Sequence, residues 1–202
     1  MQLHESNPAP NSRRVHIFMD EKDVEISRVN VDLRAGENLT PEFKAMNPMG
    51  RIPVLELDNG RFIAESVAIC RYLEELHPSP RLFGNTPESK ATIEMWNRRA
   101  ENNFMMSVAM AFRNISGIFK DREEISAEWG AISARVAADL VPVFDEQLSR
   151  NEFLAGDEFS IADITFLVAY EFAGRVQVEV PELPNIDRWL ADMKTRSSYS
   201  AR

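Results

Sequence analysis

The chain has 202 residues, of which 44% are hydrophobic and 27% charged, enough for one large or two small hydrophobic cores. Its 32 acidic residues outnumber the 23 lysines and arginines, so the net charge of −9 argues against nucleic acid or an anionic membrane as the main partner. The single cysteine, Cys70, excludes an intrachain disulfide, and no apolar run approaches the roughly 20 residues of a membrane span, so we expect a soluble cytoplasmic protein.

The first segments of the chain alternate between the periodicities of strands and helices. The run QLHES, 2–6, is typical of a short strand, and residues 12–22 carry a helical stripe of apolar side chains. The run EISRVNVDL, 25–33, alternates between polar and apolar residues, which predicts a second strand. Because a helix joins these two strands, we expect them to lie parallel in one sheet.

A second helix, a hairpin and a third helix follow. Thr40 is suited to cap a helix in which Pro41 takes the first position. The run IPVLELDNGRFIA, 52–64, predicts two short strands joined by a tight turn at Asp58-Asn59-Gly60. Apolar residues at helical spacing predict another helix over 65–76. The resulting order, β-α-β-α-β-β-α, predicts a mixed four-stranded sheet covered by helices, which is a thioredoxin-like layout.

The remainder of the chain is predicted to be helical. The run HPSPRLFGNTP, 77–87, interrupts the preceding pattern with Pro and Gly and marks a domain boundary. Helices are expected over 88–119, 127–148 and 185–195, and another opens at Ser160, with Asp163 three residues later as in a capping box. We therefore expect an α+β fold, with a thioredoxin-like domain over 1–77, a linker over 78–87 and an all-helical domain over 88–202.

The dipeptide Ile52-Pro53 stands at the start of a predicted central strand. Proline is unusual there, because it removes a hydrogen-bond donor from the ladder. In a thioredoxin-like layout, a cis proline at this point exposes the backbone of the preceding residue for pairing with an extended peptide. The alternative is a proline that caps an edge strand. The adjacent Arg51 is suited to bind a carboxylate of such a peptide, or it is a solvated surface arginine.

Glu65 and Ser66 follow the hairpin and open the next helix. The free N–H groups and the positive end of a helix attract a carboxylate, and the Ser66 hydroxyl adds a donor. Glu65 is suited to pair with an ammonium group. An α-amino acid head carries both charges and suits this pair, whereas an ordinary helix N-terminus explains the same residues without a ligand.

The loop between the first strand and the first helix contains APNS, 9–12, where thioredoxin-like oxidoreductases carry a reactive cysteine. Since the protein supplies no sulfur there, a thiol of the ligand would have to take its place. A free thiol has a pKa near about 8.5, and each unit of depression requires about 1.4 kcal/mol. The helix start at Ser12-Arg13, with one donor from Asn11, is suited to lower that pKa by about one or two units.

The sequence resembles the cytosolic glutathione transferases over nearly its whole length. The matching runs are SNPAPNSRRVHIF (6–18), GENLTPEFKAMNPMGRIPVLELDNGRFIAESVAICRYLEE (36–75), EMWNRRAE (94–101) and FLAGDEFSIADITF (153–166). The resemblance implies that glutathione is the thiol co-substrate and that the protein is a homodimer. It also implies the residues that bind glutathione, with Asn38 at its glycine end: Asn38, Arg51, Ile52, Pro53, Glu65 and Ser66.

The chain departs from the family at the residue that activates the thiol. The serine of theta- and phi-like relatives falls on Ala9, and the tyrosine of other classes falls close to His4. A bacterial nu-like group has TPN in this loop, and its asparagine matches Asn11. The resemblance therefore implies Asn11 as the donor to sulfur, with Ser12, Ser6 or backbone N–H groups as alternatives.

Asn11, His4 and Cys70 each have a second interpretation. Asn11 also suits a turn that caps the helix. His4 is either a base or a packed or solvated histidine, and Cys70 lies among apolar residues, which favours a buried core thiol. Nothing in the sequence has the spacing of metal ligands, so we expect no metal.

The leading functional hypothesis is a glutathione transferase whose bound thiolate attacks a small electrophile. The alternatives are a glutathione-dependent disulfide reductase or peroxidase of the same fold, and a non-catalytic module that binds a protein partner or serves in a stress response. The helical domain is expected to contribute dimer contacts and the electrophile site, for which Asn102, Asn103, Met106 and Met110 stand at helical spacing. The sequence does not specify the electrophile.

Overall fold

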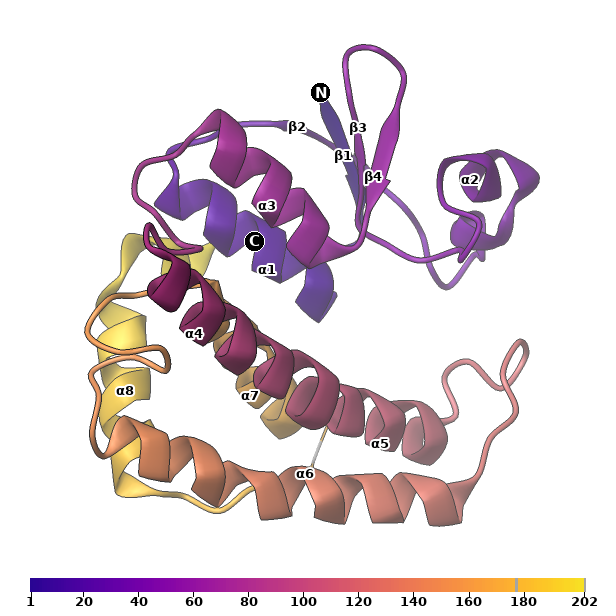
Figure 1. Ribbon diagram of the computed structural model, residues 1–202. Helices are drawn as coiled ribbons and strands as arrows, with labels where there is room; N and C mark the ends of the chain where they lie inside the picture. The colour runs from indigo at the N-terminus through magenta and orange to yellow at the C-terminus, as the bar shows by residue number, and fades with distance from the viewer. Residues whose placement is uncertain (177, 202) are drawn as a thin grey trace. The chain divides into compact units, whose positions relative to one another are not determined.

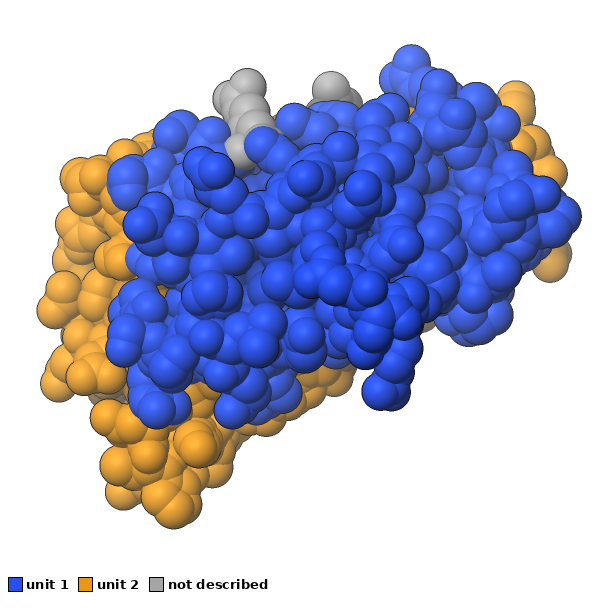
Figure 2. All heavy atoms as spheres, turned by 90° about the horizontal axis from the view of Figure 1, so that it is seen from above, with its two compact units in different colours: residues 1–81, 197–202 blue, residues 82–196 orange. Residues whose placement is uncertain are grey.

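The computed structural model describes residues 1–176 and 178–201, and the chain forms two compact units (Figure 2). Unit 1 comprises Met1–Arg81 with Ser197–Arg202, and unit 2 comprises Leu82–Arg196. The last segment thus groups with unit 1, although the sequence pattern predicts one helical domain over 88–202. The reason is visible at Ser198, which is buried and whose hydroxyl donates a hydrogen bond to Glu21 of the first helix.

Unit 1 contains the predicted mixed sheet (Figure 1). Strand β1 (Gln2–Glu5) lies parallel to β2 (Ser27–Asn30) and antiparallel to β3 (Val54–Glu56), and β3 pairs antiparallel with β4 (Phe62–Ala64). The strand order is β2-β1-β3-β4. The hairpin turn between β3 and β4 is confirmed: Gly60 adopts φ 76°, which glycine tolerates, and its N–H donates to the carbonyl of Leu57.

Three α-helices accompany the sheet: α1 (Pro10–Glu21), α2 (Pro41–Met46) and α3 (Ser66–Leu76). Helix α2 begins as predicted, because the Thr40 hydroxyl accepts a hydrogen bond from the Phe43 N–H and Pro41 takes the first position. Helices α1 and α3 pack against each other and enclose the core. Its fully buried residues include Leu3, Val15, Phe18, Leu55, Ile69, Cys70 and Leu73, so Cys70 is a core thiol.

Unit 2 consists of α-helices joined by turns: α4 (Pro87–Arg98), α5 (Met106–Ser116), α6 (Ala127–Leu148), α7 (Ile161–Arg175) and α8 (Pro184–Thr195). The single α-helix expected over 88–119 is wrong in two respects. A π-helical segment, Arg99–Met105, separates α4 from α5, and the helix ends at Ser116 because Gly117 adopts φ 60° in a left-handed C-cap. No helix within 1–176 or 178–201 is long and apolar enough to cross a membrane.

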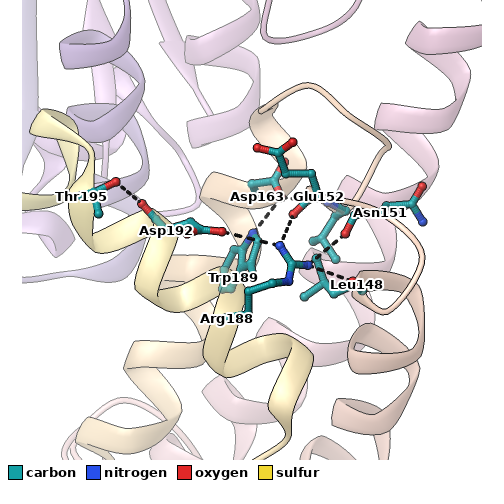
Figure 3. Close-up of polar contacts among 9 residues, drawn as sticks. Leu148, Asn151, Glu152, Asp163, Arg188, Trp189, Asp192 and Thr195 are labelled. Carbon is teal, nitrogen blue, oxygen red and sulfur yellow. Dashed lines mark hydrogen bonds and ion pairs between the residues drawn. The ribbon is translucent and has the colours of Figure 1, made fainter.

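Asp163 is the polar centre of unit 2. The capping box predicted at the start of α7 is confirmed, since the Ser160 N–H donates to Asp163 Oδ2 at 3.1 Å and the Ser160 hydroxyl caps the helix. Asp163 Oδ1 also accepts hydrogen bonds from the Leu154 N–H at 2.9 Å and from Trp189 Nε1 at 3.1 Å (Figure 3). Asp163 therefore ties α7 to α8 and to the preceding turn.

Candidate functional site

The loop before β3 holds the Ile52-Pro53 peptide bond in the predicted cis form. Asn47 braces this loop: its Nδ2 donates to the Arg51 carbonyl at 2.8 Å, and its Oδ1 accepts from the Met49 N–H at 3.1 Å. Gly50 has φ 59°, and a Cβ there would meet the Asn38 carbonyl oxygen at 3.0 Å. The loop therefore needs a glycine at this position.

The backbone of Ile52 is open to a partner. Among the residues that the structure describes, none forms a backbone hydrogen bond with Ile52, although its side chain packs beside the Val31, Phe43 and Val54 cluster. An N–H and a carbonyl left unpaired at the end of a strand can pair with the main chain of an extended peptide. Arg51, next to it, has an exposed side chain.

Asn38 supports the same loop from the side. It is 8% exposed, and its Nδ2 donates to the Gly50 carbonyl at 2.7 Å. Its Oδ1 is buried and has no hydrogen-bond partner among the residues that the structure describes. Asn38 thus holds the turn that precedes Arg51 and keeps one acceptor unused.

Glu65 and Ser66 stand at the start of α3. Glu65 is the N-cap residue, with φ 68° and an exposed side chain. A positive φ in a residue other than glycine costs free energy and is often found at binding sites. Ser66 is the first helical residue and is 5% exposed. The positive end of α3 therefore coincides with a carboxylate and a hydroxyl, as the sequence predicted.

Asn11 meets Ser66 across the starts of α1 and α3. The Ser66 hydroxyl donates to Asn11 Oδ1 at 3.4 Å, a long contact that directs the amide oxygen toward α3. The Asn11 Nδ2 group then points to the other side, and it has no partner among the residues that the structure describes. This amide is consequently able to donate a hydrogen bond to a ligand.

Arg14 was not singled out from the sequence, yet it completes this group. It is fully buried, and its Nη1 donates to the Ser66 hydroxyl at 2.7 Å. The one sequence signal is its position: Arg13 and Arg14 lie near the start of α1, where a positive charge opposes the helix dipole, and the first turn has no acid. Two cations in that place are unfavourable for the helix alone and raise the electrostatic potential there.

Ser12, by contrast, faces the protein interior. It is fully buried, and its hydroxyl accepts a hydrogen bond from the Ser6 N–H at 3.4 Å. The Ser6 carbonyl in turn accepts from the Ala9 N–H at 2.9 Å. Both serines therefore participate in closing the loop before α1, whereas Asn11 faces Ser66.

Two further side chains bear on the sequence hypotheses. His4 Nε2 lies 2.9 Å from Glu56 Oε2, so its ring forms a cross-strand pair between β1 and β3. Among residues 1–176 and 178–201, no group of three or more His, Cys, Asp or Glu side chains is placed to hold a metal ion.

Comparisons with known proteins show the family to which this fold belongs. The family model of the glutathione S-transferase N-terminal domain matches residues 9–76, and that of the C-terminal domain matches residues 107–196. Glutathione S-transferase 2 of Saccharomyces cerevisiae is 36% identical over 98% of this chain and 87% of its own length.

Two bacterial crystal structures are similar along almost the whole chain. A glutathione S-transferase domain-containing protein of Marinobacter aquaeolei is 36% identical with a TM-score of 0.96, covering 99% of this chain and 100% of that one. A glutathione S-transferase of class Gtt2 from Vibrio parahaemolyticus is 37% identical with a TM-score of 0.88, covering 99% and 96%.

Proposed function

The chain belongs to the glutathione S-transferase family and is a glutathione transferase, and we propose that its glutathione lies along the cis-proline loop of unit 1. The observation that carries this proposal is the hydrogen-bonded group of Arg14, Ser66 and Asn11, at the point where α1 and α3 both begin. Two helix N-termini and a buried guanidinium provide a positive potential there, in a chain whose net charge is −9.

The ends of glutathione are assigned by charge. Its γ-glutamyl carboxylate accepts hydrogen bonds at the start of α3, where the Ser66 hydroxyl lies and Arg14 adds positive charge, and its ammonium pairs with Glu65. The cysteinyl backbone pairs with the unpaired backbone of Ile52 beside Pro53. Arg51 follows the turn that precedes Ile52, and the Asn38 side chain donates to the Gly50 carbonyl of that turn, so we assign both residues to the glycine end.

Asn11 is the proposed donor to the glutathione sulfur. Its Nδ2 has no partner among the described residues, while Ser12 is buried and joined to Ser6. A hydrogen bond to the charged form of a group lowers the pKa of that group, and the start of α1 adds about 0.3–1 kcal/mol. Together these terms account for a depression of roughly one unit in the thiol pKa, since one unit corresponds to about 1.4 kcal/mol.

The reaction then follows from the thiolate. The thiol proton passes to solvent, and the sulfur lone pair forms a bond to an electrophilic carbon. In a substitution the leaving group departs with its bonding electrons, and in an addition the displaced electron pair is protonated. Asn102 and Asn103 of unit 2 are exposed, and Met106 is 50% exposed, so these side chains are free to contact an electrophile.

Disulfide exchange is the second candidate, because Asn11 matches the asparagine of the nu-like relatives. In that reaction the glutathione thiolate attacks a glutathione-linked disulfide, a new sulfur–sulfur bond forms, and the other thiolate leaves. Turnover on a mixed disulfide, compared with turnover on a chloro-dinitro aromatic, separates the two reactions.

We further propose a cytoplasmic homodimer. Helix α6 carries an apolar stripe on one face, formed by Trp129, Ile132, Val136, Leu140 and Val143. Three of these are unusually exposed for large apolar residues, at 50% for Trp129, 44% for Val136 and 49% for Val143. Their spacing of seven residues places them on one side of the helix, and a second copy of the chain would cover them. The single cysteine is buried, which suits a reducing compartment.

Calorimetry with glutathione tests the binding site. Ser66→Ala and Glu65→Gln are expected to weaken glutathione binding by roughly tenfold each, because each removes a partner of the charged head group. Asp58→Asn, on the exposed hairpin turn, is the control and keeps the wild-type affinity. If both site variants bound glutathione with wild-type affinity, the glutathione head group would not lie at the start of α3.

A further inference from the structure

A groove in unit 1 lies apart from the residues assigned to glutathione. It is formed by the second half of α1, the turn after it and the start of β2, and its volume is about 600 Å³. Ligand pockets commonly measure about 300–1,000 Å³, so a small organic molecule fits. Its lining combines four apolar side chains, Met19, Val24, Ile26 and Ala201, with the charged residues Asp20, Glu25 and Arg28.

Arg28 is the only cation among those charged residues, and a buried carboxylate lies close to it. Arg28 Nη1 lies 3.9 Å from Glu5 Oε1, and Glu5 is a buried carboxylate on β1. The other oxygen of Glu5 lies 3.1 Å from Nε2 of His16, which also lines the groove. The positive charge of Arg28 is therefore offset by the carboxylate of Glu5.

Those acids have no cationic partner of their own. Asp20 and Glu25 are exposed, and neither forms an ion pair with any residue that the structure describes. Asp20 and Glu25 thus give the groove two unpaired carboxylates, while its one guanidinium, that of Arg28, lies near the buried carboxylate of Glu5. The field in the groove consequently favours a cation, and the apolar side chains in its mixed lining favour one with an apolar body.

We propose that this groove binds an organic cation, a primary amine attached to an apolar chain or ring. The ammonium group lies between Asp20 and Glu25, and the apolar part covers Met19, Val24 and Ile26. A hydrated metal ion would leave these apolar side chains without contacts, and the described residues hold no cluster of metal ligands. The groove shares no residue with the proposed glutathione site, so the two ligands bind independently.

Three probes with the same apolar body and different charges test this proposal: 4-phenylbutylamine, 4-phenylbutanol and 4-phenylbutyrate. Each is titrated into the ¹⁵N-labelled full chain, and the amide resonances of Val24, Glu25 and Arg28 are followed. The amine is expected to bind with saturation, and raising the salt concentration weakens it, because exposed charges are screened.

The matched variants are the double substitution Asp20→Asn with Glu25→Gln, and the control Asp23→Asn. Asp23 is an exposed acid in the same turn that does not line the groove, and its φ of 52° is tolerated by asparagine. The double variant is expected to bind the amine roughly threefold to tenfold more weakly, while the control binds as the wild type does.

Several results would overturn the proposal. Equal binding of the alcohol would show that the groove is merely apolar, and tighter binding of the carboxylate would show that Arg28 makes an anion site. Unsaturable shifts, or equal losses in the double variant and the control, would show non-specific attraction to an acidic surface. Glutathione affinity, measured in the same samples, stays unchanged in the double variant.

Discussion

At the scale of single residues, the candidate site is built on a contact between positions that lie far apart in the sequence. Arg14 and Ser66 are separated by 52 residues and joined by a hydrogen bond of 2.7 Å. The two residues come into contact because helices α1 and α3 pack against each other. The guanidinium is buried, so it keeps the Ser66 hydroxyl in one orientation and adds positive charge where we place the head of glutathione.

Substituting Arg14 by Met removes this charge and preserves much of the side-chain volume. The Arg14→Met variant is expected to lose about 1–3 kcal/mol of unfolding free energy, because the buried Ser66 hydroxyl loses its donor. The affinity for glutathione should fall as well. Urea unfolding measures the loss of stability, and calorimetry measures the loss of affinity. Arg13→Met is the matched control, because Arg13 donates instead to the Tyr199 carbonyl at 3.1 Å. Equal glutathione affinity in both variants would contradict a role for Arg14.

Sequence reasoning reached some of these residues and missed others for a physical reason. Pro53, Glu65 and Ser66 are marked by their place next to a strand or helix end, and that place can be read from local patterns. Arg14 carries no such mark, because burial of an arginine depends on what packs over it. The preference for Asn11 over Ser12 came from the family resemblance, and the burial of Ser12 adds a physical reason that the sequence could not provide.

At the scale of secondary structure, the buried carboxyl group at the start of α7 is expected to make the stability of the protein depend on pH. Burial raises the pKa of the Asp163 carboxyl from 3.8 to about 6, although four hydrogen bonds to it act in the opposite direction. Between the two values the folded protein binds more protons at this group than the unfolded chain does. The contribution of Asp163 to stability therefore falls as the pH rises from about 4 to 6.

The Asp163→Asn variant cannot titrate at this position, so it isolates the effect. It should be less stable than the wild type, because an amide group would face N–H donors at one of the two oxygen positions. Its deficit should shrink by about 2 kcal/mol between pH 4 and pH 7, since the shift is roughly two units and the unfolded carboxyl is already partly ionised at pH 4. Urea unfolding at both pH values measures this, with Asp139→Asn on the surface of α6 as control. A deficit independent of pH would show that Asp163 titrates normally.

The helix boundaries illustrate what local patterns can and cannot predict. The caps at Thr40 and Ser160 are local interactions within three residues, and both form as predicted. The π-helical segment Arg99–Met105 has no such local mark. It lies where the helix packs against α6 and α7 and where Phe104 meets Phe144 and Phe166, so tertiary packing accompanies the change in helical geometry.

At the scale of the whole molecule, a substitution in the apolar stripe of α6 tests the proposed dimer. The Val136→Glu substitution places a charge at the centre of the stripe, and burying that charge against a second copy is unfavourable. Sedimentation equilibrium is expected to show a dimer for the wild type and a monomer for this variant. Ala131→Glu adds the same charge on another side of α6 and should remain dimeric. A monomeric wild type would contradict the dimer itself.

The fold of the whole chain can be predicted from the sequence more readily than the substrate of the protein can. The order of strands and helices in unit 1 follows from alternating periodicities, and the family follows from matching runs along the chain. An electrophile leaves no comparable pattern, because exposed side chains such as Asn102 and Met106 contact many shapes with similar free energy.

The most direct test of the central claim is the ultraviolet absorbance of the glutathione thiolate, titrated against pH on the wild type and on Asn11→Ala. We predict that bound glutathione ionises roughly one pH unit below free glutathione in the wild type, and that Asn11→Ala removes most of this shift while glutathione still binds. An unchanged shift in Asn11→Ala would contradict the role of Asn11 and assign the activation to the backbone N–H groups of α1 or to Ser6. Binding without any shift in the wild type would contradict activation of the thiol at this site.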